Sequence, residues 1–455
     1  MRNSTTTQGV LFEGVFGKPL HARFDQLHAS SDGGSVLLGA VDSRLGLIDR
    51  LAACLEDGRD PAKRRHELRE LIAQRVFGLA CGYEDANDAA RLADDPVHKL
   101  LVGRDPVLGA ALASQPTLSR FENGMDRGDL LQMSEALLET VLARRMPWKV
   151  QRITVDLDVT DDPTHGAQQL SIFNGRYGTA CYLPLLAFVT FNGEPDQHLV
   201  AAMLRPGNAP TSRGALPLLI RVLDALQRRF PRARILVRLD GGFAGPELLH
   251  FLDEVCVDYA VGLPGNPVLE RLAEPFMDAV RVRSILTGAT EHDYAAAPYA
   301  ARSWDRERRV VIKAEVTQNL GRELRDNPRF VVTNLTAGPQ RIYERIYCQR
   351  GEIENRIKEL HLGLQIDRTS CSRFLANQLR VLLTAAAFVL LQDLRRRAAG
   401  TRFARAQVWT LREQLLKLGA RVVVSARRIV LHLPQAFPFL IPWRRVAFAL
   451  GGRAG

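Results

Sequence analysis

Cysteine is scarce in this chain and never occurs in a closely spaced pair. Six cysteines are scattered over 455 residues, and no Cys-x-x-Cys motif brings two of them together. This pattern argues against a zinc site and against a disulfide scaffold, and it is typical of a protein from a reducing cytoplasm. The six are Cys54, Cys81, Cys181, Cys256, Cys348 and Cys371.

Long hydrophobic runs are also absent. The longest, at 379–391, is interrupted by Arg380, and it is shorter than the ~20 residues that span a bilayer as a helix. The first stretch, MRNSTTTQGVLFEGVFGKPL, has no apolar signal-peptide core. The chain also lacks a G-x-x-x-x-G-K-S/T phosphate loop and any heptad or solenoid repeat. We therefore expect a cytoplasmic protein that uses neither a membrane nor a nucleotide cofactor.

Acidic residues are outnumbered by basic ones. Lys and Arg total 61 against 50 Asp and Glu, for a formal net charge of +11, and the pI is about 9.7. This balance indicates a polyanionic partner, nucleic acid first and an anionic membrane surface second. Only seven of the basic residues are Lys. Because a GC-rich genome inflates Arg whatever the function, the charge alone does not decide the partner.

The N-terminal region, residues 1–148, is predicted to be helical. Apolar residues recur at three- and four-residue spacing, most clearly at 66–82. Residues 114–123 predict a short helix in which Thr117 or Ser119 caps the start. This region fits either a helix-turn-helix that enters the major groove of DNA or a plain helical bundle.

From residue 149 the pattern changes to that of an α/β domain. Short β-branched segments alternate with amphipathic helices, which predicts a mixed sheet. The segment 265–340 is predicted to be a β-rich insertion, and helices return at 341–398. The predicted strands lie at 152–159, within 169–193, and at 198–208, 233–243, 257–264, 308–317 and 329–335; the predicted helices lie at 212–230, 245–255 and 342–398, and a hairpin at 420–434 belongs to a basic C-terminal region, 399–455.

Three acidic residues stand at positions that suit chemistry. Asp158 lies on a predicted strand and shares one face with Asp156. Asp240 follows a strand at a Gly-Gly turn, where open α/β sheets place ligands. Glu354 lies on a predicted helix. Carboxylates that converge from separate elements bind Mg²⁺, and two such ions stabilise both oxygens of an in-line phosphoryl displacement. Taken singly, each acid also fits a turn, a cap or an ion pair such as Glu354 with Lys358.

The sequence motifs around these acids are similar to those of a known family. The stretches DLDVTDDPTHGAQQLSIFNGRYGTACYLPLLAFV, RLDGGF and YCQRGEIENRIKE resemble the DDE transposases of bacterial insertion sequences. The likeness is greatest to the thirteen-eighty family, which belongs to the branch marked by a Tyr-Arg-Glu-Lys pattern. It spans most of the chain, from the N-terminal helices to the basic tail.

The resemblance implies an RNase H-like catalytic domain that is interrupted by the β-rich insertion. It implies that Asp158, Asp240 and Glu354 are the catalytic acids and hold two Mg²⁺ ions, with Mn²⁺ as an alternative. Asp156 is the rival of Asp158 for the first role. The implied partner is double-stranded DNA, both the terminal inverted repeats and the target, bound by a homodimer in the bacterial nucleoid.

Further residues follow from the same resemblance. Tyr347, Arg350 and Glu354 match the branch pattern, whereas the Lys expected seven residues after Glu354 is His361. Lys358, one helical turn after Glu354, is a candidate substitute. Arg350 is expected to hold a phosphate in a bidentate fork, and Tyr347 to contact a phosphate or stack on a base.

Other candidates carry less specific signals. Trp304 in the insertion is a candidate to stack on a flipped base, although a structural Trp fits as well. His165 is a candidate metal ligand or acid–base group, or a loop histidine that binds its own backbone. The Arg-rich C-terminal third is expected to contact phosphates; its members are Arg395, Arg396, Arg397, Arg402, Arg405, Arg427, Arg428, Arg444 and Arg445.

Three functions remain open at this point. The first is a transposase that cleaves DNA and joins its ends to a target. The second is an RNase H-like nuclease without strand transfer. The third is an inactive DNA-binding regulator, against which the intact Asp158, Asp240 and Glu354 count.

Overall fold

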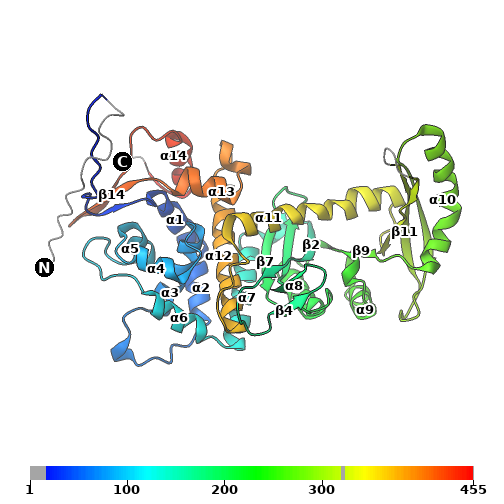
Figure 1. Ribbon diagram of the computed structural model, residues 1–455, viewed down its shortest axis with the longest axis horizontal. Helices are drawn as coiled ribbons and strands as arrows, with labels where there is room; N and C mark the ends of the chain where they lie inside the picture. Colours follow the sequence, from blue (N-terminus) through cyan, green and yellow to red (C-terminus); the bar gives the residue numbers. More distant parts are fainter. Residues whose placement is uncertain (1–16, 319–322, 454–455) are drawn as a thin grey trace.

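A nine-stranded mixed sheet runs from the middle of the molecule, at β7 and β2, to one end, at β11 (Figure 1). The computed structural model describes residues 17–318 and 323–453; residues 1–16, which carry most of the stretch without a signal-peptide core, lie outside them. Eight strands run in the order β10-β11-β13-β9-β8-β2-β6-β7, and β12 pairs with β11. The pairs β2–β8 and β8–β9 are parallel and the others antiparallel, so the predicted mixed sheet is present.

The strands and helices of this part follow the predicted order. Strand β2 begins with a buried, β-branched segment, which explains why its alternation was readable. The strands and helices from residue 152 to 263 are β2 (Arg152–Val159), β6 (Leu185–Phe191), β7 (His198–Met203), α8 (Ala215–Arg229), β8 (Arg234–Leu239), α9 (Pro246–Glu254) and β9 (Asp258–Leu263). A small separate sheet contains β3 (Asp162–Pro163), β4 (Ile172–Asn174) and β5 (Thr179–Tyr182).

The segment 265–340 extends the same sheet instead of forming a separate one. Strand β13 (Arg329–Thr333) pairs with β9, and β11 (Arg308–Thr317) pairs with β13 and with β10 (Glu291–Tyr299). A helix that was not predicted, α10 (Pro267–Thr287), packs on β10 and β11. Asn266 caps it by accepting from two backbone N–H groups, and Pro275 lies inside it, which obscured its periodicity. The short β12 spans Arg325–Asp326.

A long helical run returns from this segment to the rest of the chain (Figure 1). It starts as the π-helical η6 (Arg341–Tyr347), continues through η7 (Cys348–Gly351) and becomes α11 (Glu352–Leu364). It therefore crosses the end of the central sheet, where the predicted acids lie.

The N-terminal helices surround α12 (Phe374–Arg397). This helix is long and apolar enough to cross a membrane, but 83% of its most apolar window is buried inside the molecule, which confirms it as a core helix. The helix at 115–123 begins after Ser114, which holds the N-cap position without a side-chain capping hydrogen bond, so neither Thr117 nor Ser119 caps its start as expected. The N-terminal helices are α1 (Val36–Leu45), α2 (Leu47–Ala53), α3 (Leu68–Ala80), α4 (Ala89–Leu92), α5 (Pro96–Val102), α6 (Gln115–Asn123) and α7 (Arg127–Ala143), of which α1, α3, α6 and α7 pack against α12.

The C-terminal part folds back onto the N-terminal part (Figure 1). The predicted hairpin is present as β14 (Ala420–Ser425) and β15 (Arg428–His432), and β14 also pairs with β1 (Ala29–Ser30). The helix α14 (Leu440–Ala449) contacts α12. The connection between α12 and the hairpin contains α13 (Val408–Leu411) and the π-helical η9 (Arg412–Leu416).

Candidate active site

Asp158 and Asp240 lie at the same end of two neighbouring parallel strands. Strand β2 pairs with β8 so that Asp156 is opposite Arg238. Two residues further along, Asp158 and Asp240 therefore stand at one edge of the sheet. Asp240 caps the short η5 (Gly241–Phe243), and its Oδ1 accepts from the Gly242 N–H at 2.9 Å. Both side chains are half-buried.

The third predicted acid reaches this edge from the long helical run. Glu354 lies in the first turn of α11 and is exposed. One turn earlier, Arg350 Nη1 lies 3.2 Å from Asp158 Oδ2. Burial raises the pKa of Asp158; the Arg350 charge opposes this shift, and the negative charges of Asp240 and Glu354 add to it. The negative charges of Asp240 and Glu354 thus act on Asp158, which is paired with the Arg350 guanidinium.

Asp156 occupies a different environment. It is fully buried, and both of its oxygens are held by Arg238, with Nε 2.8 Å from Oδ1 and Nη2 2.7 Å from Oδ2. Gln197 also donates to Oδ2 at 3.2 Å, and Arg238 donates onward to the backbone carbonyl of Ile346 at 3.0 Å. The pair therefore ties β2 and β8 to η6. A carboxylate that is enclosed and neutralised in this way is not free to bind a cation.

Tyr347 lies against the backbone beside Asp240. A Cβ on Gly262, in β9, would stand 2.4 Å from the Tyr347 hydroxyl and 2.8 Å from the Gly241 nitrogen. Only glycine leaves room for this approach. Burial raises the pKa of Tyr347, Arg350 opposes the shift and Asp240 adds to it. Sequence reasoning missed Gly262, because nothing local to β9 shows that a helix from 80 residues later packs there.

His361, which takes the place of the expected Lys, connects α11 to the end of β2. Its Nε2 lies 2.7 Å from the Thr160 hydroxyl, and its Nδ1 lies 3.1 Å from Asp367 Oδ2. Thr160 follows Asp158 by two residues, and His361 follows Glu354 by two helical turns. The contact therefore spans the two elements that carry Asp158 and Glu354. Sequence reasoning named His361 but missed both partners, while Lys358 is exposed on the same helix.

The remaining predicted residues are not brought to this edge by any contact within the described part of the chain. Trp304, between β10 and β11, is half-buried; its ring packs edge-on against Tyr299 with centroids 5.3 Å apart, and the Arg308 guanidinium lies 5.2 Å from its centroid. His165 is exposed. Arg395, expected on a phosphate-contacting surface, is instead buried and donates to Glu359 at 2.8 Å, because α12 is the core helix.

The donor set at the edge suits a hard divalent cation. Asp158, Asp240 and Glu354 offer carboxylate oxygens, which Mg²⁺ and Mn²⁺ prefer. The pKa of Asp158 is raised by burial and by the two other acids, so bound positive charge would relieve their repulsion. The donor chemistry therefore fits such an ion, although among the described residues the oxygens of these three acids do not all lie within 4.8 Å of one another.

Comparison with known proteins adds one finding. Residues 12–449, nearly the whole chain, match the family described as transposase DDE domain group 1, whose RNase H-like fold agrees with the mixed sheet described above. No curated protein matches the chain.

Proposed function

Because this chain belongs to the transposase DDE domain family, group 1, we propose that it binds the terminal inverted repeats of an insertion sequence, cleaves them and transfers the strands to target DNA. Membership makes it a DNA-acting transposition enzyme. The observation that best supports the finer proposal is the placement of Asp158, Asp240 and Glu354 on β2, after β8 and on α11, at one edge of the sheet. These are the proposed catalytic acids.

We propose that the three acids hold two Mg²⁺ ions, or Mn²⁺ in their place. When bound, these ions stabilise the charge that develops on the attacking and leaving oxygens of a phosphoryl displacement. The chain itself supplies the oxygen donors and fixes their separation. The Arg238–Asp156 pair holds β2, β8 and η6 together, and the His361–Thr160 contact holds α11 to the end of β2.

Arg350 is the proposed phosphate ligand beside the acids. A guanidinium carries five N–H groups in a rigid fork, and the contact with Asp158 at 3.2 Å uses one nitrogen. Its position on the helix before Glu354 places positive charge where a DNA phosphate must approach. Lys358, exposed one turn after Glu354, is proposed as a second phosphate contact, and contacts of Tyr347 and Trp304 with DNA stay predictions.

The finer family placement is also a proposal. Tyr347, Arg350 and Glu354 match the Tyr-Arg-Glu-Lys pattern of the thirteen-eighty family, and His361 replaces the Lys. We further propose that residues 1–148 bind DNA, that 149–264 and 341–398 form the catalytic domain interrupted by 265–340, and that two copies act together on the element ends in the nucleoid.

The direct test uses the DNA that flanks the coding region. A labelled fragment bearing its terminal repeat is incubated with the protein, a target plasmid and Mg²⁺. Product joined to the plasmid supports transposition, whereas cleavage without joining supports a nuclease. Binding without either reaction supports a regulator. Asp158→Asn should abolish both reactions, and Asp161→Asn, a half-buried neighbour of the same type, should leave them intact.

A further inference from the structure

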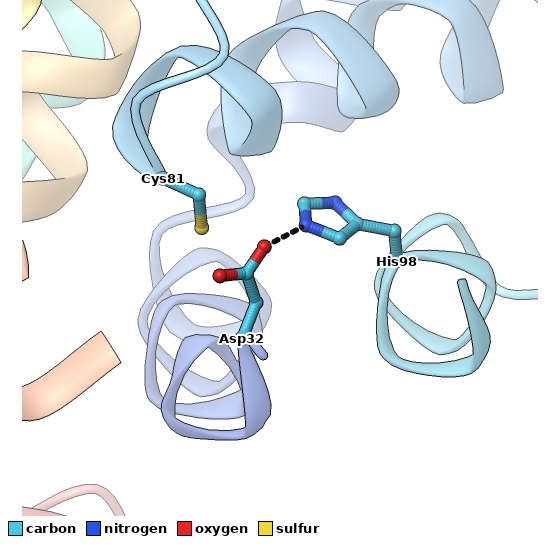
Figure 2. Close-up of side chains that lie close together, drawn as sticks. All are labelled: Asp32, Cys81 and His98. Atoms are coloured by element: carbon cyan, nitrogen blue, oxygen red, sulfur yellow. Dashed lines mark hydrogen bonds and ion pairs between the residues drawn. The ribbon is translucent and has the colours of Figure 1, made fainter. Parts of the chain in front are cut away.

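A second group of side chains converges far from the catalytic edge, among the N-terminal helices. Asp32 immediately precedes η1 (Gly33–Ser35), Cys81 immediately follows α3 and His98 lies on α5. Their oxygen, sulfur and nitrogen donors all lie within 4.8 Å of one another. Figure 2 shows the three side chains pointing toward a common point from three separate elements. All three residues are buried, with at most 1% exposed.

The surroundings hold these donors in place. The backbone of Asp32 is fixed on both sides, since its N–H donates to the Ser30 hydroxyl at 3.0 Å and its carbonyl accepts from the Ser35 hydroxyl at 2.6 Å. The Lys417 ammonium lies 2.8 Å from Asp32 Oδ1, and His98 Nε2 lies 2.8 Å from Asp32 Oδ2. Lys417 thus occupies one carboxylate oxygen and leaves the other turned toward His98 and Cys81, as outer partners do in metal sites.

We propose that Asp32, Cys81 and His98 bind one Zn²⁺ ion, which is separate from the catalytic ions and cross-links the N-terminal helices. Thiolate, imidazole and carboxylate are the ligands that zinc takes in proteins, whereas Mg²⁺ prefers oxygen alone. Three protein donors leave the fourth tetrahedral position for water. Because the site is closed to solvent, the ion is acquired as the chain folds.

The binding step balances in charge and protons. Zinc requires the thiolate of Cys81 and the neutral imidazole of His98, so it displaces the thiol proton and any proton on the imidazole to solvent. When both protons leave as the doubly charged ion enters, the net charge of the site is unchanged, and Lys417 keeps its contact with Oδ1. No redox partner or further reactant is needed.

The competing state is a metal-free ion pair of Asp32 with His98 and Lys417. Burial lowers the pKa of His98, but hydrogen bonds to Asp32 and Cys81 outweigh this and raise it to about 10. In that state Cys81 contributes no ligand to a metal. Zinc content and thiolate coordination therefore distinguish the two states, because the ion pair produces neither.

The experiment measures metal in the full-length protein. The chain is produced in zinc-supplemented medium so that the ion is present as it folds, purified without chelator, passed through a desalting column and analysed by mass spectrometry of the elements. We expect one zinc per chain in the wild type and in the matched control Cys54→Ser, a half-buried cysteine outside the triad. Cys81→Ser and His98→Gln should lose it. Asp158→Asn with Asp240→Asn and Glu354→Gln should retain it, which separates this site from the proposed catalytic ions.

Cobalt provides a readout that does not depend on the variants folding. Co²⁺ bound through a thiolate gives a sulfur-to-metal charge-transfer absorption, which we expect in the wild type and in Cys54→Ser. A wild type that binds no zinc and shows no such band with Co²⁺ would overturn the proposal, as would zinc retained undiminished in folded Cys81→Ser.

Discussion

Carboxylates at the open edge of the sheet lie near other negative charges, whereas the carboxylate of Asp156 in its interior is paired with a buried guanidinium. At the edge, the negative charges of Asp240 and Glu354 act on Asp158, whose oxygens accept from the Val159 N–H and pair with Arg350. In the interior, Arg238 engages both oxygens of Asp156. These two aspartates are two residues apart on one strand and face the same side. The residues around each aspartate, rather than its position in the sequence, therefore leave Asp158 available for chemistry and make Asp156 part of the folded interior.

The sharpest test of this contrast removes one charge at the edge. Asp158→Asn, Asp240→Asn and Glu354→Gln keep the shape of each side chain but delete a proposed ligand. We expect each to lower DNA cleavage by on the order of 1000-fold or more, since each removes charge stabilisation specific to the transition state. The rate is measured on labelled terminal-repeat DNA with Mg²⁺.

The stability of these three variants completes the test. Burial disfavours the charged form of Asp158, so Asp158→Asn should leave the free energy of unfolding unchanged or raise it slightly. Full cleavage by a folded Asp158→Asn protein would remove Asp158 from the catalytic set. Asp161→Asn is the matched control and should cleave normally.

Asp156→Asn should produce the reverse result. It leaves the buried Arg238 guanidinium without its charge partner, and breaking such a pair costs about 3–5 kcal/mol. Urea unfolding should therefore show a large loss of stability in Asp156→Asn and little in Asp158→Asn. The double variant Asp156→Leu with Arg238→Met, which removes both charges, should recover much of the loss. Equal stability losses at positions 156 and 158 would contradict the contrast.

The same contrast explains what the sequence could predict. Strand β2 and strand β11 were predicted because their patterns are local. The helix α10 was missed because Pro275 interrupts it. The three acids were named through their motifs, but the pairing of Asp156 with Arg238 depends on the register of β2 against β8. The space at Gly262 and the partners of His361 depend on long-range packing, which no local pattern encodes.

His361 tests how closely the edge must be held. His361→Ala removes the contact between α11 and Thr160, and we expect cleavage to fall by about 10- to 100-fold, as for other residues that orient metal ligands. If His361 acts by positioning, the Mg²⁺ concentration needed for half-maximal rate should rise as well. Leu362→Ala, an exposed neighbour on the same helix, is the control. A lower rate with an unchanged Mg²⁺ requirement would argue against the positioning role.

The smallest expected effect concerns an enclosed carboxyl that forms no ion pair with any residue in the part of the chain that the structure describes. Asp162 is fully buried and accepts from the Thr369 hydroxyl at 2.8 and 2.9 Å. Burial raises its pKa to about 8, and Thr369 only partly opposes the shift. In the unfolded chain this group ionises near 3.8, so between these values the folded state holds a proton that the unfolded state releases. The stability contribution is therefore complete at low pH and declines as the pH rises toward 8.

Asp162→Asn removes this titration while keeping an oxygen for Thr369. We expect the wild type to lose about 1–2 kcal/mol of unfolding free energy between pH 5 and pH 6 relative to Asp162→Asn. Asp161→Asn should follow the wild-type curve, and urea unfolding at several pH values measures all three. If the unfolding free energies of wild type and Asp162→Asn changed in parallel with pH, the interior would accommodate the ionised Asp162 without a cationic partner. Burial alone would then not separate Asp162 from the acids at the edge.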